Sequence, residues 1–346
     1  MNARERVLTA LDHREPDRVP VAFDAPLEMA EKLRAHFGVE DNPSLYRAMG
    51  IDGFNIAAEA YVFPEYTGPN PYDLPFINYI NFWGVDGNQQ QLPLENIESM
   101  AQLDDYLWPQ ADWFSYDHIA EQCAEIRKLG LPTVGGEGGC GIQHCIHMRG
   151  YERALIDTCM NPDLAHAYLD RMCDFFVEWN ERWLSAGDFD VFRSGDELGS
   201  NTATHVQPDV WREFYKPRLK RVFAVAKKHG CKIWFHCCGC CRPLIEDLIE
   251  IGVDLWDPVS DYVAGNDHIE LKREFGDRLS FIGGVNVKDV VRHGTPDDVR
   301  EEVRRRIDIL APGGGYIVGG SQGIMEECPF ENVLAMYDEA VKYGAY

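Results

Sequence analysis

The strongest chemical signal in the sequence is the run Phe-His-Cys-Cys-Gly-Cys-Cys, which spans 235–241. His236 and Cys238 are two residues apart, and residues at that spacing on a strand point to the same face. Imidazole and thiolate are ligands that zinc prefers, so the pair is a candidate metal site. The alternative is a buried histidine beside inert thiols, because cysteine is common in protein cores.

A second group of metal-ligating residue types lies in the run Gly-Gly-Cys-Gly-Ile-Gln-His-Cys-Ile-His, at 138–147. On a helix, Cys140 and His144 would share a face, and so would His144 and His147. The group is either a second metal site or a source of ligands for the first. The glycine-rich start indicates that only the later part is helical, which argues against an independent site.

Other catalytic motifs receive little support. The glycine-rich stretches 135–141 and 311–323 contain no Lys or Arg. Tight turns, or space for a bulky ligand, are therefore favoured over a phosphate site there. The sequence has no GxSxG, Walker or dinucleotide-binding motif, so nucleophilic and nucleotide chemistry are not indicated.

Composition restricts the class of protein and of partner. The chain has 346 residues, 45% of them apolar, with 57 acidic against 33 basic residues and a net charge of -24. This acidic surface repels phosphate backbones, so a nucleic-acid partner is not expected. No apolar run reaches the roughly 20 residues of a membrane helix, and the start lacks an apolar signal core. We expect a cytoplasmic protein whose 11 cysteines are reduced thiols.

The elements that must position these residues alternate along the chain. Eight short apolar runs are predicted strands, at 19–24, 53–59, 132–137, 189–196, 232–238, 254–257, 280–286 and 315–320. Helix-length amphipathic segments separate them. Asn161-Pro162 and Thr295-Pro296 are typical helix starts, and Pro217 predicts a break in the helix that Pro208 begins. The pattern predicts a single (β/α)8 TIM barrel over residues 1–346.

Active sites of such barrels lie at the carboxyl ends of the strands, and here those ends are polar. The predicted strands end at or near Asp24, Glu59, Glu137, Asp196, Glu197, His236, Cys238, Asp257, Asn286, Ser321 and Gln322. Several carboxylates at one mouth need a cation or a shared proton to coexist. The pattern therefore favours a metal or a polar, cationic ligand.

The segment 61–108 interrupts the alternation. It is long, aromatic and rich in Pro and Asn. Such a connection is usually a functional loop, although a surface hairpin over one barrel end is equally compatible. We expect it to overhang the barrel mouth and to supply aromatic walls, including Tyr61 and Trp83, to the ligand site.

The sequence resembles the uroporphyrinogen decarboxylase superfamily over nearly its whole length. The segments that carry the resemblance are RERVLTALDHREPDRVPV (4–21), INFWGVDG (80–87), GDELGSNTATHVQPDVWREFYKPR (195–218), FHCCGCCRPLIEDLIEIGVDLWDPV (235–259), GGVNVKDVVRHGTPDDVREEV (283–303) and GGGYIVGGSQGIMEECPFENVLAMYDEA (313–340). The resemblance implies a (β/α)8 barrel. It also implies either a haem-pathway decarboxylase or a zinc-dependent methyltransferase that works with a corrinoid or a thiol.

The two branches differ at identifiable positions. The decarboxylases carry an Arg-rich segment after the first strand, where this chain reads FDAPLEMAEKLRAHFG (23–38). They also carry His-Gly where this chain has Gln322-Gly323. Both departures count against uroporphyrinogen as the substrate.

The methyltransferases bind zinc through His-x-Cys after the fifth strand and a later Cys, and His236 and Cys238 match the first part. The later Cys aligns with Gln322, so the resemblance leaves the third ligand open among Cys328, Glu137 and Asp196. With Cys328 as the third ligand, Asp196 or Glu197 could orient His236 through its second nitrogen, and Glu137 would be free to manage a proton.

The functional expectation is a zinc-dependent methyltransferase. It would move a methyl group between a small methoxyl, thiol or amine substrate and a corrinoid such as methylcobalamin, or a corrinoid carrier protein. The residues expected to bind the substrate are Glu59, Tyr61, Trp83, Asp257 and Asn286. Two alternatives stay open: a metal-free decarboxylase or lyase in which Asp24 or Asp196 stabilises a cationic intermediate, and a non-catalytic tetrapyrrole-binding barrel. The oligomeric state, a homodimer included, is not determined.

Overall fold

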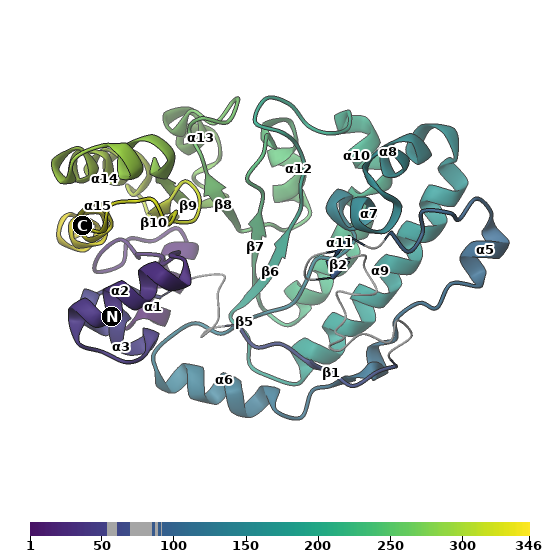
Figure 1. The fold of residues 1–346 in the computed structure, drawn as a ribbon, viewed down its shortest axis with the longest axis horizontal. Coiled ribbons are helices and arrows are strands. Elements are labelled where there is room, and N and C mark those ends of the chain that lie inside the picture. Colours follow the sequence, from purple (N-terminus) through teal and green to yellow (C-terminus); the bar gives the residue numbers. More distant parts are fainter. Residues whose placement is uncertain (54–60, 70–84, 87–88, 91) are drawn as a thin grey trace.

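A parallel sheet forms the centre of the molecule. The computed structural model describes residues 1–53, 61–69, 85–86, 89–90 and 92–346. In these residues six strands are hydrogen-bonded in the order β10-β9-β8-β7-β6-β5 (Figure 1). Their bounds are β5 Val134–Gly135, β6 Val191–Gly195, β7 Lys232–His236, β8 Leu255–Val259, β9 Ser280–Val285 and β10 Tyr316–Gly320. These are the last six predicted strands, in chain order.

Two further segments extend the sheet at its edges. Val21 forms a parallel bridge with Val318 beside β10, and Tyr61 forms one with Val134 beside β5. Asp52 donates its backbone N–H to the Val21 carbonyl at 3.1 Å, beside the first of these segments. The predicted strand at 53–59 lies almost wholly outside the described residues. Chain order and parallel pairing are those of the predicted α/β barrel, although the described residues do not close the ring.

Helices cover the outer face of the sheet. The predicted starts are confirmed: α9 is Pro162–Ser185 and α14 is Pro296–Leu310, the latter with a capping box at Thr295. The predicted break is confirmed too, because α10 (Pro208–Phe214) ends just before α11 (Lys216–Lys228), with Pro217 in its first turn.

The remaining elements connect or flank this framework. The other α-helices in the described residues are α1 Ala3–Leu11, α2 Leu27–Phe37, α3 Asn42–Met49, α5 Met100–Asp104, α6 Ile119–Lys128, α7 Ile142–Arg149, α8 Tyr151–Met160, α12 Ile245–Glu250, α13 His268–Phe275 and α15 Phe330–Tyr343. Short turns of helix are η1 Ala111–Trp113, η2 Arg242–Leu244 and the π-helix η3 Val287–Val291. Two small antiparallel pairs join β1 (Glu65–Tyr66) to β4 (Phe114–Ser115) and β2 (Val85–Asp86) to β3 (Gln89–Gln90).

The inner face of the sheet has its own apolar core. It consists of Val7, Leu11, Ala22, Val134, Val191, Trp234, Leu255, Ile282 and Ile317. Val7 and Leu11 belong to α1, so this helix fills one end of the barrel. A second, larger core joins the outer face of the sheet to the helices. The inner core fixes which strand residues face inward, and therefore which ones reach the open end.

The described part of segment 61–108 packs against helices. Phe63 contacts Trp179 and Trp183 of α9 edge-on, and the Trp183 indole donates to the Val62 carbonyl at 3.0 Å. Further along, Arg149 of α7 donates to the Ile97 carbonyl at 2.8 Å. This part of the segment therefore flanks the barrel.

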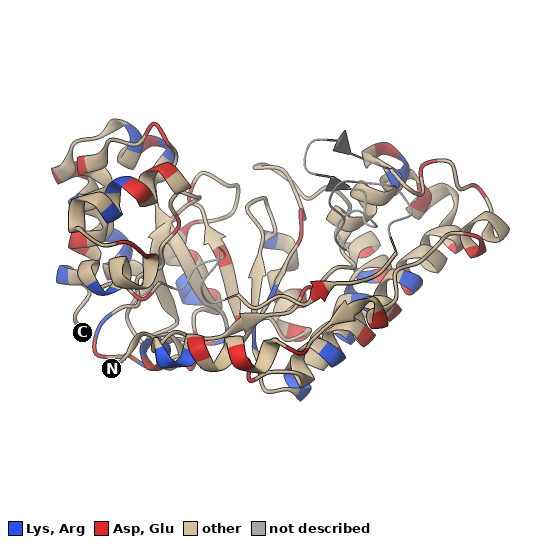
Figure 2. Ribbon diagram, turned by 60° about the horizontal axis from the view of Figure 1, so that its bottom comes forward, with Lys and Arg blue, Asp and Glu red and all other residues tan. Residues whose placement is uncertain are grey.

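Charged side chains of both signs are interspersed along the outer helices (Figure 2). The two termini lie close together, because Val19 donates its N–H to the Gly344 carbonyl at 2.7 Å. Across the described residues, no helix has the length and apolar character needed to cross a bilayer.

Candidate functional site

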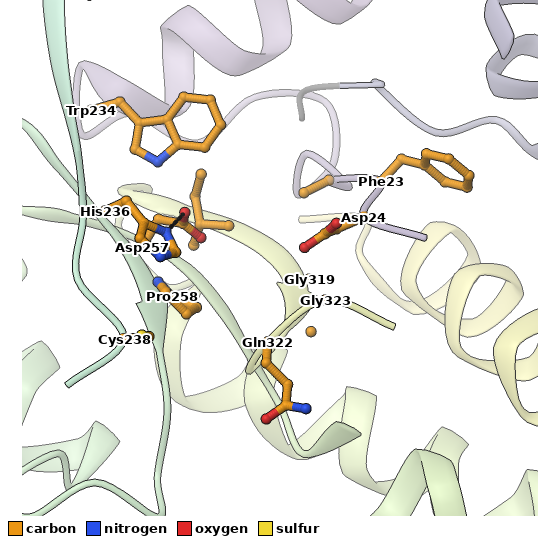
Figure 3. Close-up of a pocket in the computed structure, with 13 residues that line it drawn as sticks. Phe23, Asp24, Trp234, His236, Cys238, Asp257, Pro258, Gly319, Gln322 and Gly323 are labelled. Carbon is orange, nitrogen blue, oxygen red and sulfur yellow. Dashed lines mark hydrogen bonds and ion pairs between the residues drawn. The ribbon is translucent and has the colours of Figure 1, made fainter. Parts of the chain in front are cut away.

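A cavity of about 230 Å³ lies at the carboxyl end of the sheet (Figure 3). Five chain segments contribute to its wall. The lining residues are Ala22, Phe23, Asp24, Trp234, His236, Cys238, Asp257, Pro258, Ile282, Gly319, Gly320, Gln322 and Gly323. Five of the sequence-predicted site residues are thus brought together, namely Asp24, His236, Cys238, Asp257 and Gln322. The structure places these five at one mouth of the barrel.

Strand β7 places the histidine and the cysteine. Trp234 belongs to the inner core, so His236 and Cys238 follow it at intervals of two on the same face. The Cys238 side chain lies close enough to His236 to help raise the pKa of the imidazole. The alternation that suggested the pair therefore holds through His236, the last residue of β7, and on to Cys238, two residues beyond it.

His236 is held by Asp257 from the neighbouring strand. The register of β7 and β8 puts the two residues opposite each other. Asp257 Oδ2 is 2.9 Å from His236 Nδ1, the contact drawn as a dashed line in Figure 3. Burial alone would lower the pKa of His236, but hydrogen bonds to Asp257 and Cys238 and the charge of Asp257 raise it to about 10. The residue that orients His236 is thus Asp257, and the expectation that Asp196 or Glu197 does so is wrong.

Glu197 contacts the thiol instead. The Cys238 Sγ lies 3.6 Å from Glu197 Oε1, in hydrogen-bonding geometry. Glu197 is half-buried and does not line the cavity itself. The thiol donates to this carboxylate, which fixes the position of Cys238 at the edge of the cavity.

Two residues close the opposite wall. Asp24 faces the cavity across from His236 (Figure 3), and burial together with the charge of Asp257 raises its pKa. Gln322 accepts a hydrogen bond from the Tyr262 hydroxyl at its Oε1, at 3.0 Å. This contact leaves the Gln322 amide N–H groups for other partners. The ammonium of Lys288 lies 5.3 Å from the centre of the Tyr262 ring.

Asp196 performs a different task from the one predicted. It is buried, and its carboxylate accepts backbone N–H groups of Ile142, Gln143 and Glu197 at 3.0, 2.8 and 2.9 Å. Gly141, at the N-cap of α7, has no side chain to cap the helix, so Asp196 supplies the cap from β6. Burial raises the pKa of Asp196 to about 6, although these hydrogen bonds favour the carboxylate.

Glu137 lies beyond β5 and outside the cavity lining. The Asn180 side chain binds both backbone groups of Glu137. Its Oδ1 accepts from the Glu137 N–H at 3.0 Å, and its Nδ2 donates to the Glu137 carbonyl at 2.8 Å. The side chain accepts from the N–H groups of Gly138 and Gly139, and burial raises its pKa despite the nearby charge of Arg193. These contacts make it a fixed, half-buried carboxyl rather than a mobile one.

Three other predicted residues are also outside the cavity lining. Asn286 caps η3 by accepting from the Asp289 N–H at 2.9 Å. Cys328 is buried in a turn whose N–H bonds the Met325 carbonyl at 3.0 Å. Tyr61 donates to the Gly136 carbonyl at 2.7 Å and contacts Trp183 edge-on. Glu59 and Trp83 lie outside the described residues.

The second cysteine-histidine group is only partly helical. Cys140 precedes α7, while His144, Cys145 and His147 belong to it, as the glycine-rich start predicted. His144 packs edge-on against Phe176, and burial lowers its pKa to about 3, so it is neutral. The rings of His144 and His147 are 6.4 Å apart on a shared face.

The donor types at the cavity fit a zinc ion. His236 offers an imidazole whose Nδ1 is held by a carboxylate, the usual support of a metal-binding histidine, and Cys238 offers a thiol beside Glu197. Nowhere in the described part of the chain do three His, Cys, Asp or Glu side chains form a group that could hold a metal. His236 and Cys238 thus offer two donors of the types that zinc binds.

Sequence analysis missed several residues of this region. Trp234 and Pro258 line the cavity, Tyr262 holds Gln322, and Arg193 of β6 faces the barrel interior. The alternation of side chains between the two faces of each strand could have identified some of them. Trp234 is two residues before His236, and Arg193 is two residues after the inward-facing Val191.

Comparison with known proteins places this geometry in a family. The sequence model for uroporphyrinogen decarboxylase (URO-D) matches residues 88–343. The chain belongs to the URO-D family. Membership explains why the cavity lies at the carboxyl ends of barrel strands, and it agrees with the resemblance seen in the sequence.

Two individual proteins are similar to this URO-D family member. One is the methylated-thiol–coenzyme M methyltransferase of Methanosarcina mazei, 28% identical over 191 residues, which are 55% of this chain and 47% of that protein. The match thus spans about half of the relative's length. The other is the solved structure of a methyltransferase from Methanosarcina mazei, with a TM-score of 0.68 and 20% identity over 99% of both chains. This structural similarity supports the barrel fold of the chain.

Proposed function

We propose that this URO-D family protein is a methyltransferase. It moves a methyl group between a small substrate held in the cavity and a corrinoid or its carrier protein, with zinc bound by His236 and Cys238. The supporting similarity is the methyltransferase of Methanosarcina mazei, which matches 55% of the chain. The observation that carries the proposal is the contact chain Asp257–His236–Cys238–Glu197, which faces one cavity with an imidazole and a thiol.

The residues around the cavity have separate tasks in this proposal. Asp257 fixes the imidazole through Nδ1, which leaves Nε2 as the nitrogen for a metal. Glu197 holds the Cys238 thiol through a hydrogen bond, and binding of a metal would release the thiol proton. A bound zinc ion would stabilise the anionic form of a thiol or alcohol, which is the reactive form of a methyl acceptor.

Other groups shape the space where the methyl group is transferred. Trp234, Pro258 and Ile282 give the cavity an apolar wall that excludes water from the reacting centre. Gln322, anchored by Tyr262, presents amide N–H groups beside it. The cavity opens at the carboxyl end of the barrel, where a corrinoid bound to a carrier protein has access.

The test compares two cysteines. Wild-type protein purified without chelator and supplied with zinc is expected to hold about one zinc per chain, measured by atomic emission. Cys238→Ala is expected to lose that zinc and the methylation of cob(I)alamin by a methylated thiol, followed by absorbance. Cys159→Ala is the matched control, because this thiol is exposed on α8 and away from the cavity.

A wild-type protein with well under one zinc per chain contradicts the proposal, and so does a Cys238→Ala variant with normal zinc content. Metal-free decarboxylation is then the second candidate. The observation that favours it is Asp24, a carboxyl that faces the cavity across from His236 and can stabilise a cationic intermediate. Release of carbon dioxide from a pyrrole carboxylate, lost in Asp24→Asn, would establish it.

A further inference from the structure

The loop that follows β6 forms a hairpin over residues 199–204. Gly199 and Thr204 pair as an antiparallel bridge. The Ser200 N–H donates to the Ala203 carbonyl at 2.9 Å, which closes the turn. Gly199 is buried, whereas residues 200–203 are exposed. The hairpin therefore has a buried base and a tip on the surface.

The hairpin is bound to the loops that follow β7 and β8, the next two strands of the sheet (Figure 1). The Cys240 N–H, from the loop after β7, donates to the Ser200 carbonyl at 2.7 Å. The Ala264 N–H, from the loop after β8, donates to the Asn201 carbonyl at 2.8 Å. The Cys240 thiol donates to the Ala264 carbonyl at 3.6 Å, which completes a closed ring of contacts. The three loops that follow β6, β7 and β8 are thus held at one fixed separation.

Gly239 lies between Cys238 and this ring, directly against the hairpin. A Cβ atom at Gly239 would be 1.7 Å from the Gly199 carbonyl oxygen, and one at Gly199 would be 2.7 Å from the Cys240 carbonyl oxygen. Neither glycine has a positive φ, so it is the close approach of two backbones that requires glycine at both positions. The two facing glycines let the hairpin sit on the residue that follows Cys238.

We propose that the 199–204 hairpin positions Cys238, and that Gly239 is the positioning residue that lets the hairpin reach it. The inference rests on the proposed zinc site and names the part of the chain that holds one of its two donors in place. Glu197, at the root of the hairpin, accepts from the Cys238 thiol at 3.6 Å. The hairpin itself holds the backbone that follows Cys238, so this residue is fixed at its side chain and at its main chain.

The size of the displacement that a side chain would cause explains why this contact matters for a metal. Carbon and oxygen atoms in contact are usually at least about 3.3 Å apart, so a Cβ atom at Gly239 would push the Gly199 backbone away by more than about 1 Å. Distances in a metal site have to be correct to within about 0.2 Å. Such a shift beside Cys238 would take its sulfur out of bonding range, while His236 stays in place on β7.

The experiment uses three glycine-to-alanine variants of the full chain. Gly239→Ala introduces the steric conflict beside Cys238, and Gly199→Ala introduces it from the hairpin alone. Gly276→Ala is the matched control, because its Cβ would meet the Lys272 carbonyl oxygen at 2.5 Å, at the end of α13 and outside the cavity lining. The melting temperature of each variant shows that it is folded.

The first measurement is the rate at which iodoacetamide alkylates Cys238 in metal-free protein, followed by mass spectrometry with exposed Cys159 as the internal reference. We expect this relative rate to rise about tenfold in Gly239→Ala and in Gly199→Ala, because local opening releases the thiol. It should keep the wild-type value in Gly276→Ala. A general loosening of the fold would instead expose the buried cysteines as well.

The second measurement is cobalt(II) binding. Cobalt(II) held by a thiolate has a charge-transfer absorption band, which reports the metal–sulfur bond directly. We expect Gly239→Ala and Gly199→Ala to bind cobalt(II) about 10- to 100-fold more weakly, which is the usual loss when the support of a metal ligand is removed, and to show a weaker band. Gly276→Ala should retain the affinity and the band of the wild type.

An unchanged or slower alkylation of Cys238 in Gly199→Ala would overturn the inference, because the hairpin would then not act on the thiol. An effect in Gly239→Ala alone, an equal effect in Gly276→Ala, or an unchanged cobalt(II) affinity in both hairpin variants would overturn it too. A wild type that binds no cobalt(II) contradicts the proposed zinc site instead. The alkylation rates of the metal-free variants then still decide whether the hairpin positions Cys238.

Discussion

Asp257 determines which nitrogen of His236 is available to a ligand. Its carboxylate engages Nδ1 at 2.9 Å, so Nε2 remains for the cavity. The same strand end supplies a backbone contact, since the Cys237 N–H donates to the Asp257 carbonyl at 2.7 Å. At the scale of single residues, the site is a chain of hydrogen bonds across two adjacent strands.

The substitution Asp257→Asn tests this chain of hydrogen bonds. The amide retains the shape but loses the charge that orients and polarises the imidazole. Loss of such a supporting group typically lowers metal affinity by about 10- to 100-fold. We expect zinc affinity, measured by competition with a chromogenic chelator, to fall by that factor. Asp209→Asn on exposed α10 should leave it unchanged, and an unchanged affinity in Asp257→Asn would show that Asp257 does not support a metal ligand.

At the scale of elements, α7 depends on a neighbouring strand for its start. The glycine-rich sequence before it predicts where the helix begins but gives no capping side chain. Asp196 supplies the missing acceptor, with Oδ2 bound to the Ile142 N–H and Oδ1 to the N–H groups of Gln143 and Glu197. A residue that the sequence suggested as catalytic thereby holds a helix in place.

Removal of this cap should destabilise the protein. Asp196→Ala leaves three N–H groups without an acceptor, two of them in the first turn of α7, and we expect a loss of about 3 kcal/mol in the free energy of unfolding. Asp196→Asn retains one oxygen for two of these groups and should lose about half as much. Urea unfolding measures both. Equal losses would mean that the charge, rather than the number of acceptors, determines the effect.

Helix α13 carries a lysine whose protonation opposes folding. Burial lowers the pKa of Lys272 to about 8, and its ammonium donates to the Gly314 carbonyl at 2.7 Å. The unfolded chain has the ordinary pKa of about 10.5, so between these values it binds more protons than the folded chain. Stability due to this group therefore rises as the pH increases from about 8 to about 10.5.

A comparison with Lys272→Met isolates that contribution. The free energy of unfolding of the wild type relative to Lys272→Met should increase by about 2 kcal/mol between about pH 7 and pH 10. The lost bond to Gly314 adds an offset that does not depend on pH. The same comparison for exposed Lys342→Met should show no change, and a flat Lys272 difference would contradict the lowered pKa.

At the scale of the whole molecule, the first barrel segment is held from both sides. Val21 pairs with Val318 of β10, and the Val21 N–H donates to Asp52 Oδ2 at 2.8 Å. Asp52 is fully buried and forms ion pairs with Arg6 and Arg18. This group connects α1, the first segment and the chain that leads toward the second predicted strand.

Asp52→Ala should therefore cost more stability than loss of a surface carboxylate. It removes the buried carboxylate that two arginines and one N–H share, and breaking a buried ion pair typically destabilises by about 3–5 kcal/mol. Asp12→Ala is the control, because its contacts with Arg14 and Lys232 are largely exposed and should contribute less than about 1 kcal/mol. Urea unfolding compares the two variants, and similar losses would show that the Asp52 group is not a structural centre.

The sequence by itself determined everything that depends on local periodicity. The period of two on β7 placed His236 and Cys238 on one face, and Asn161-Pro162 and Thr295-Pro296 marked two helix starts. Alternation of strands and helices then indicated the barrel, because the connections are short and the strands are parallel.

The tertiary structure decided which side chains meet across strands. Register placed Asp257 opposite His236, and the approach of α7 to β6 made Asp196 a helix cap. These contacts join residues far apart in the chain, and their partners are set by sheet register and helix packing. Local patterns contain no information on either.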